Sequence, residues 1–334
     1  MRLAVTAALL LVVSGGACGK PGAGERDAPS TPGDDADPGD RDAPTTGVDG
    51  SLSCPVDTWC LETSPVAGVR LEGVYAVDAG DVFAVGAGGV ILRRRADVWT
   101  QMTSNTTADL KGVWGANSSD VWAVGVAGTL LHWDGSAWTP QTGVTTRDLE
   151  AAWGSSATDV WIAATGAVLH FDGQSWSTQN LTGSLFAISG TGPNDVWATG
   201  ENARVHHYNG AWDVGGSINP YGTGGTNNFF AVLALAPDNV WVSAAVIGKE
   251  TMNFTGGAGA WTPHGTSVTI FAGLWGTAAN NLWGAGQSGK VGHHDGSAWS
   301  IEVPLGVTSA LRAVTGAGSH VWIVGGDATI LHRD

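Results

Sequence analysis

Histidine has the most regular chemical pattern in this sequence. Five of the nine histidines recur at one position of a repeated motif: His132, His170, His207, His293 and His332. Imidazole could ligate a metal ion or act as a general base. Residues that share a position of a repeat, however, lie on different repeat units and cannot converge on one ion. We therefore expect a structural or surface role for this histidine column, with no metal site and no cofactor.

Catalytic motifs are the next candidates for chemistry. The sequence lacks an HExxH pair, and no serine elbow, phosphate-binding loop or dinucleotide-binding fingerprint stands in the context that it requires. We therefore expect no catalytic residues and interpret the chain as a protein that is not an enzyme.

The longest break in the repeat is the segment DVGGSINPYGTGGTNNFF, residues 213 to 230. Loops on a rigid scaffold often carry binding specificity. Tyr221, Asn227 and Asn228 could stack on a sugar or hydrogen-bond to it. The alternative is a glycine-rich insertion that binds no ligand.

A run of three arginines, Arg93, Arg94 and Arg95, replaces the LHWD sequence found at the matching position of other repeats. It could contact an acidic partner, and the alternative is a solvated run of charge. These are the only clustered cations, and the formal net charge is −15. Nucleic-acid binding is therefore not expected, because it requires clustered lysine and arginine.

The elements that must position these residues are short strands. Glycine (51 residues) and tryptophan (17) are abundant, charged residues make up only 13%, and no stretch shows amphipathic helical periodicity. One motif recurs, as in LKGVWGANSSDVWAVGVAGTLLHWDGSAWTP from Leu110. Its DVW element begins at Asp81, Asp120, Asp159, Asp195, Asn239, Asn281 and His320, in steps of 36 to 44 residues. A period near 40 residues is typical of a four-stranded propeller blade. The sequence therefore predicts an all-β, seven-bladed β-propeller of four-stranded blades.

The tryptophans indicate how the ring closes. A tryptophan ends most repeats, but the seventh copy stops at ILHRD before its own tryptophan. Trp59 precedes Asp81 by 22 residues, close to the 21 residues from Trp99 to Asp120. We therefore expect a strand around Trp59 to complete the last blade, a closure that removes exposed sheet edges.

The N-terminal region has a different composition. Arg2, an apolar run and the sequence GGAC ending at Cys18 predict a signal peptide over residues 1 to 18. Residues 19 to 50 are rich in Pro, Gly, Asp and Thr and predict a solvated tether, with the propeller over residues 51 to 334. Cys54 and Cys60 remain in the exported part, where we expect a disulfide.

Two resemblances follow from these motifs. The end of the signal segment is similar to a bacterial lipobox, which implies acylation of Cys18 and an outer-membrane lipoprotein; an ordinary signal peptide is the alternative. The repeat resembles the propellers grouped with Asp-box (BNR) proteins, photosystem II assembly-factor-like proteins and tectonin-type lectins.

The function that we expect from these resemblances is non-catalytic. The leading hypothesis is a binding or scaffolding module, present as a monomer and held to the membrane by its lipid alone, which contacts an envelope protein. The first alternative is a lectin-like module for a cell-surface polysaccharide. A glycan hydrolase is the weaker alternative, because a sialidase-like site would need three converging arginines and a tyrosine nucleophile. The candidates for such a set are scattered along the chain: Arg70, Arg147, Arg204, Arg312 and Arg333, with Tyr75, Tyr208 and Tyr221.

Overall fold

The computed structural model describes residues 57 to 213, 227 to 245, 251 to 256, 261 to 265 and 269 to 334. All described residues belong to one compact unit, Pro44–Asp334. Cys18, Cys54 and Tyr221 lie outside the described residues. No helix among the described residues has the length and apolar character needed to cross a membrane.

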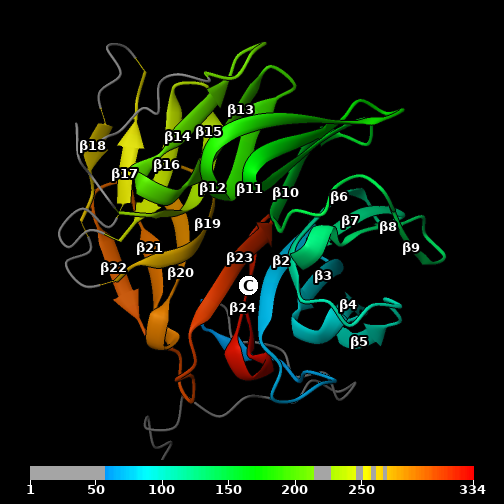
Figure 1. The fold of residues 1–334 in the computed structure, drawn as a ribbon. Coiled ribbons are helices and arrows are strands. Elements are labelled where there is room, and N and C mark those ends of the chain that lie inside the picture. Colours follow the sequence, from blue (N-terminus) through cyan, green and yellow to red (C-terminus); the bar gives the residue numbers. More distant parts are fainter. Residues whose placement is uncertain (1–56, 214–226, 246–250, 257–260, 266–268) are drawn as a thin grey trace, which may run out of the picture. The chain divides into compact units, whose positions relative to one another are not determined.

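The described residues form antiparallel sheets connected by tight turns (Figure 1). The first sheet contains β2 (Leu71–Asp78), β3 (Asp81–Gly86), β4 (Ile91–Arg95) and β5 (Val98–Met102). The second contains β6 (Leu110–Asn117), β7 (Asp120–Gly125), β8 (Leu130–Trp133) and β9 (Trp138–Pro140). The third contains β10 (Leu149–Ser156), β11 (Asp159–Phe171), β12 (Trp176–Gly192), β13 (Asp195–Gly200) and β14 (Val205–Tyr208).

The remaining strands form three further sheets. The fourth contains β15 (Phe229–Ala236), β16 (Asn239–Ala244), β17 (Thr251–Phe254) and β18 (Trp261–Pro263). The fifth contains β19 (Phe271–Ala278), β20 (Asn281–Gly286), β21 (Val291–His294) and β22 (Trp299–Glu302). The sixth contains β23 (Leu311–Ala317), β24 (His320–Gly325), β25 (Ile330–Arg333) and, at its edge, β1 (Cys60–Leu61).

The all-β propeller is confirmed, but the prediction of seven four-stranded blades is wrong. Within the described residues there are six sheets, five of four strands and one of five. The difference arises at β12, where Trp176 to Ser184 faces β11 and Leu185 to Gly192 pairs with β13. Because no loop interrupts this strand, the third and fourth repeats share a single sheet.

Five of the hairpins between a repeat's second and third strands turn through a short 3₁₀ segment. These segments are η1 (Ala87–Gly89), η2 (Val126–Gly128), η3 (Glu201–Ala203), η4 (Gln287–Gly289) and η5 (Gly326–Ala328). In each, the last two residues have positive φ, as in Gly88 and Gly89. Two successive left-handed residues match the right-handed twist of the flanking strands.

The first strands of successive repeats line the axis of the ring. β2, β6, β10, β12, β15, β19 and β23 each contact the next, and β23 contacts β2 (Figure 1). The hydrophobic cores lie between neighbouring sheets: one contains Phe83 of β3 together with Trp138 of β9. Another joins Leu71 of the first sheet to Trp322 of the last. The ring is therefore closed by packing between the first and last sheets.

The predicted closing strand is present. β1 pairs antiparallel with β25, Cys60 opposite His332 and Leu61 opposite Leu331. Trp59 lies edge-on to Trp283 with ring centroids 5.4 Å apart. Cys60 belongs to this closing strand. Its predicted disulfide partner, Cys54, is outside the described residues, so the disulfide stays a prediction.

Candidate functional site

The central channel is a cavity of about 860 Å³ with charged and aromatic side chains in its lining. The first strand of every repeat contributes to its wall. Glycine at the third position of several of these strands permits close approach. A Cβ atom on Gly73 would lie 2.9 Å from the carbonyl oxygen of Lys111, and one on Gly112 would lie 2.9 Å from the Cα of Ala151. Residues at equal positions of neighbouring strands therefore lie at the same level of the channel.

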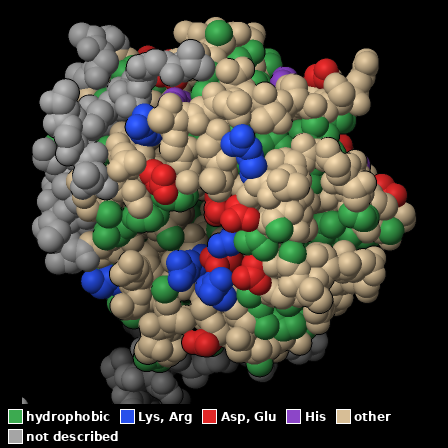
Figure 2. Space-filling view, in the orientation of Figure 1, with side chains coloured by type: hydrophobic (Ala, Val, Ile, Leu, Met, Phe, Trp, Pro, Cys, Tyr) green, Lys and Arg blue, Asp and Glu red, His purple; other side chains and the backbone are tan. Residues whose placement is uncertain are grey.

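The residue that follows the first core residue of each wall segment forms a ring at one end of the channel, which we call the mouth ring; in β12 this segment begins at Leu185. Its members are Glu72, Lys111, Glu150, Phe186, Phe230, Ala272 and Arg312. Figure 2 shows basic and acidic side chains gathered around the hollow near the middle of this face, with hydrophobic side chains beside it. The channel entrance is therefore divided into a charged arc and an apolar arc.

Two arginines neutralise the first carboxylate of the charged arc. The Arg70 guanidinium donates a hydrogen bond to Glu72, and Arg312 Nε lies 4.0 Å from the other Glu72 oxygen. This second contact spans the junction between the last and first sheets. Glu72 is therefore engaged within the chain.

Glu150 is in a different electrostatic position. Burial raises the pKa of its carboxyl, Lys111 opposes this rise, and the nearby carboxylates of Asp148 and Glu72 add to it. A carboxylate that is partly desolvated and has negative neighbours gains most from an additional cation. Glu150 is therefore the member of the mouth ring best suited to receive a positive group from a ligand.

The apolar arc centres on two aromatic rings. Phe186 and Phe230 stack with centroids 6.1 Å apart and an interplanar angle of 13°. Both side chains are only partly buried. A partly exposed aromatic pair is the type of surface that serves as an anchor in protein recognition.

Deeper in the channel, the wall is built from the tryptophans of the VWG motif. A Cβ atom on Gly154 would come within 2.6 Å of the Trp114 ring, and one on Gly190 within 2.7 Å of the Trp153 ring. Glycine in this motif therefore makes room for the tryptophan of the preceding repeat. These tryptophans therefore have a packing role between neighbouring repeats.

The arginine run is largely engaged within the chain. Arg93 is buried and donates to both carboxylate oxygens of Asp81, at 2.7 and 2.6 Å. Arg94 is also buried and lies 3.0 Å from Glu62. Arg95 contacts Asp81 at 3.0 Å with an exposed side chain. Of the three residues predicted to contact an acidic partner, Arg95 alone presents its side chain to solvent.

The two described asparagines of the predicted sugar-binding loop support a turn. The Asn228 side-chain oxygen accepts a hydrogen bond from the Asn202 amide at 3.3 Å, and the Asn227 carbonyl accepts one from Ala203. Asp109 makes the equivalent contact to the Gly88 amide, at 2.8 Å. Asn228 therefore occupies a structural position of the repeat.

The histidine column has the structural role that was predicted for it in four repeats. His132, His170, His207 and His293 each bond to the residue that begins the DVW element of the same repeat, at 2.6 to 3.1 Å. Each ring also stacks on the tryptophan of its DVW element. In the last repeat His332 meets His320 and Asp334, and among the described residues this group places three metal-ligating atoms within 4.8 Å of one another.

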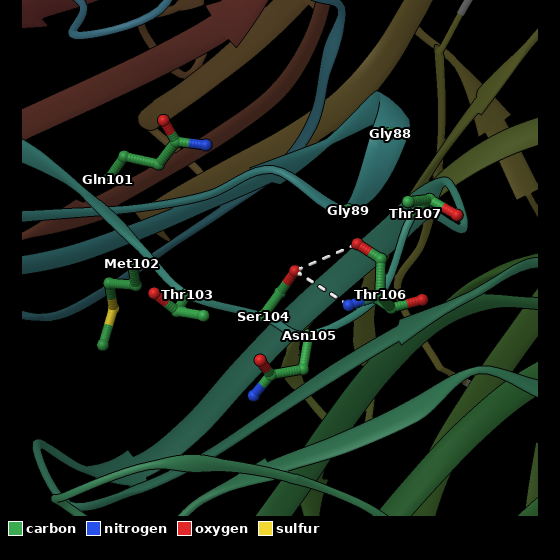
Figure 3. Close-up of a pocket in the computed structure, with 9 residues that line it drawn as sticks. All are labelled: Gly88, Gly89, Gln101, Met102, Thr103, Ser104, Asn105, Thr106 and Thr107. Carbon is green, nitrogen blue, oxygen red and sulfur yellow. Dashed lines mark hydrogen bonds between the residues drawn. The ribbon is translucent and has the colours of Figure 1, made fainter.

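A second pocket of about 770 Å³ lies beside the first hairpin (Figure 3). It is lined by Gly88, Gly89 and the segment 101 to 107. The Ser104 hydroxyl bonds to the backbone of Thr106 and so holds the loop to itself. None of its lining side chains titrates, so this pocket offers little for catalysis or ion pairing.

The comparisons with known proteins concern architecture. No family model matches the chain, and no curated protein matches it. Solved structures do match. YCF48 bound to D1 peptide shares 16% identity, with 84% of this chain and 98% of that chain covered, at a TM-score of 0.67. Virginiamycin B lyase from Staphylococcus aureus shares 14% identity over 82% and 98%, at 0.71. The WD40 propeller domain of Doa1 shares 10% over 83% and 97%, at 0.67.

These similarities define the class as a β-propeller. Because the neighbours include a lyase as well as a WD40 domain, the shared fold indicates architecture and leaves function to the site. The mouth ring was not recognised in the sequence, because its members share a position without sharing a residue type. The sequence does contain a signal for this ring. In each repeat, the residue directly after the first core residue of the VWG strand varies in type, as Glu72 does after Leu71 and Lys111 after Leu110.

Proposed function

We propose that this propeller is a non-catalytic binding module that holds an extended, basic segment of a partner protein at the mouth ring. The observation that carries this proposal is the juxtaposition at one channel entrance of Glu150 with the stacked pair Phe186 and Phe230. A segment with a cationic side chain next to an apolar one would satisfy both arcs at once.

Two further observations support a basic partner. The formal net charge of −15 favours encounter with positively charged chains. The propeller YCF48 has been solved with a D1 peptide bound, which shows that a ring of this architecture can hold a peptide.

The experiment is selection from a random peptide library on the purified protein, followed by affinity measurements with variants. Selected peptides should be rich in lysine or arginine beside apolar residues. Phe186→Ala and Glu150→Gln should each weaken their binding about tenfold, equivalent to about 1.4 kcal/mol. Added salt should reduce the effect of Glu150→Gln, because that contact is electrostatic.

Two control variants separate the mouth ring from general surface effects. Leu305→Ala removes a fully exposed apolar side chain, and Asp78→Asn removes an exposed carboxylate at the far end of β2. Both should leave peptide affinity unchanged. Selected peptides that bind the mouth-ring variants as tightly as the wild type would overturn the proposal.

We also propose that the module is exported by a bacterium and anchored to the outer membrane through Cys18. The support is the apolar run before GGAC and the composition of residues 19 to 50, which are rich in Pro, Gly, Asp and Thr. After expression in a Gram-negative host, the wild type should fractionate with membranes, whereas Cys18→Ser should be absent from them or remain unprocessed. Equal membrane association of both proteins would contradict lipid anchoring.

A further inference from the structure

The last repeat departs from a contact that other repeats share. The residue that begins the second strand of a repeat usually accepts a hydrogen bond from the column histidine, as Asp120 does from His132 at 2.8 Å. In the last repeat this position is His320, so two imidazoles face each other. The Nδ1 atom of His320 lies 3.2 Å from Nε2 of His332.

A carboxylate completes the group. Asp334 Oδ1 lies 2.7 Å from His320 Nδ1 and 3.0 Å from His332 Nε2. A zinc ion with bonds of about 2.0 to 2.1 Å has tetrahedral ligand atoms about 3.3 Å apart. The three atoms are therefore spaced close to one face of a zinc tetrahedron, and the fourth corner remains for water.

The surroundings orient the buried ligand. Glu62 Oε1 lies 3.1 Å from His332 Nδ1, and Arg94 in turn holds Glu62. Because a carboxylate only accepts hydrogen bonds, Glu62 holds a proton on Nδ1, and in the neutral imidazole the lone pair is then on Nε2, the ring nitrogen beside His320 and Asp334. A carboxylate on the distal nitrogen is the usual support of a zinc-bound histidine. Trp322 stacks on both imidazoles and fixes their planes.

The group is also reachable from solvent. The side chains of His320 and Asp334 are each 34% exposed, while that of His332 is 8% exposed. An ion could thus enter from the exposed side and contact one buried ligand and two accessible ones.

We propose that His320, His332 and Asp334 bind a Zn²⁺ ion where the ring closes. His332 lies opposite Cys60 of β1, and Glu62 follows that strand directly. An ion at this place would tie the last repeat to the N-terminal strand that completes its sheet. This inference is independent of peptide binding at the mouth ring.

The test uses the full chain, without an affinity tag, after removal of bound metal with a chelator. Titration should show one Zn²⁺ per chain, and Co²⁺ should give the intense visible absorption of a tetrahedral site. Saturating Zn²⁺ should raise the melting temperature by about 3 °C or more, because an ion that binds only the folded chain stabilises it.

Two variants copy contacts that other repeats already make. His320→Asn recreates the Asn281 to His293 contact of the sixth repeat, so this variant should fold normally. Its affinity for Zn²⁺ should fall at least about 100-fold, because one ligand is lost. His293→Asn recreates the Asn239 to Asn253 contact of the fifth repeat and should bind Zn²⁺ like the wild type.

Either of two results would overturn the site. One is the absence of stoichiometric Zn²⁺ binding by the wild type. The other is equal affinity and equal Co²⁺ absorption in the wild type and His320→Asn, which would place the ion elsewhere on the chain.

Discussion

In the first repeat, Arg93 takes the position that histidine occupies in most others. It bonds to Asp81, which begins the preceding strand, and its guanidinium lies 4.6 Å from the centre of the Phe83 ring. His132 makes the corresponding contacts to Asp120 and Trp122. The same three-part contact is thus built from different residue types. The arginine run consequently belongs to the repeat, although its sequence suggested a surface patch.

Loss of the ion pair between Arg93 and Asp81 should measurably lower the stability of the fold. Asp81→Asn leaves a buried guanidinium without its carboxylate, and the free energy of unfolding at pH 7 should fall by about 3 kcal/mol in a urea titration. Asp97→Asn is the control, because its exposed carboxylate contacts Arg94 while Glu62 still neutralises that arginine. It should change stability by less than about 0.5 kcal/mol.

The stability lost in Asp81→Asn should depend on pH, because the ion pair requires an ionised Asp81 carboxylate. Burial alone would raise the pKa of the Asp81 carboxyl, but hydrogen bonds from Arg93 and Arg95 outweigh this effect and hold the pKa below its usual value. A depressed carboxyl stabilises the fold above its unfolded pKa and loses this contribution as the pH falls through the folded value. The difference between wild type and Asp81→Asn should therefore shrink below about pH 4. A difference that stays constant into acid would argue against the ion pair.

At the scale of elements, the sequence predicted the second strands closely. Strands begin at Asp81, Asp120, Asp159, Asp195, Asn239, Asn281 and His320, the residues at which the DVW elements start. The spacing of the repeats and their glycine content suffice to locate these strands. Each second strand is buried between two neighbouring strands, so it appears in the sequence as a continuous apolar run.

The merged sheet was not predicted, because it depends on the length of one connection. Leu149 follows Trp138 after eleven residues, whereas Leu185 follows Trp176 after nine. The shorter connection continues as β12 without a loop. The mouth ring was not predicted either. Glu150 and Phe186 occupy the same position of the repeat but differ in residue type, and a repeat pattern reveals only residue types that recur.

At the scale of the whole molecule, stability depends on how the first and last strands meet. The N-terminal segment contributes more than the two paired residues of β1. Trp59 packs against Trp283, and Glu62 lies 3.0 Å from the buried Arg94. Arg333 also lies 3.1 Å from Asp57. These contacts connect the start of the described chain to three of its sheets.

Deletion of residues 51 to 64 should therefore destabilise the entire ring. It leaves β25 as an open edge and removes Glu62 from Arg94, which then keeps the exposed carboxylate of Asp97 as its ion-pair partner. We expect the melting temperature to fall by at least about 6 °C relative to a control that lacks only residues 1 to 50. The open edge should also promote aggregation, which light scattering would detect. If the two proteins melt together, β1 adds little to closure, and the packing of Leu71 against Trp322 must hold the ring by itself.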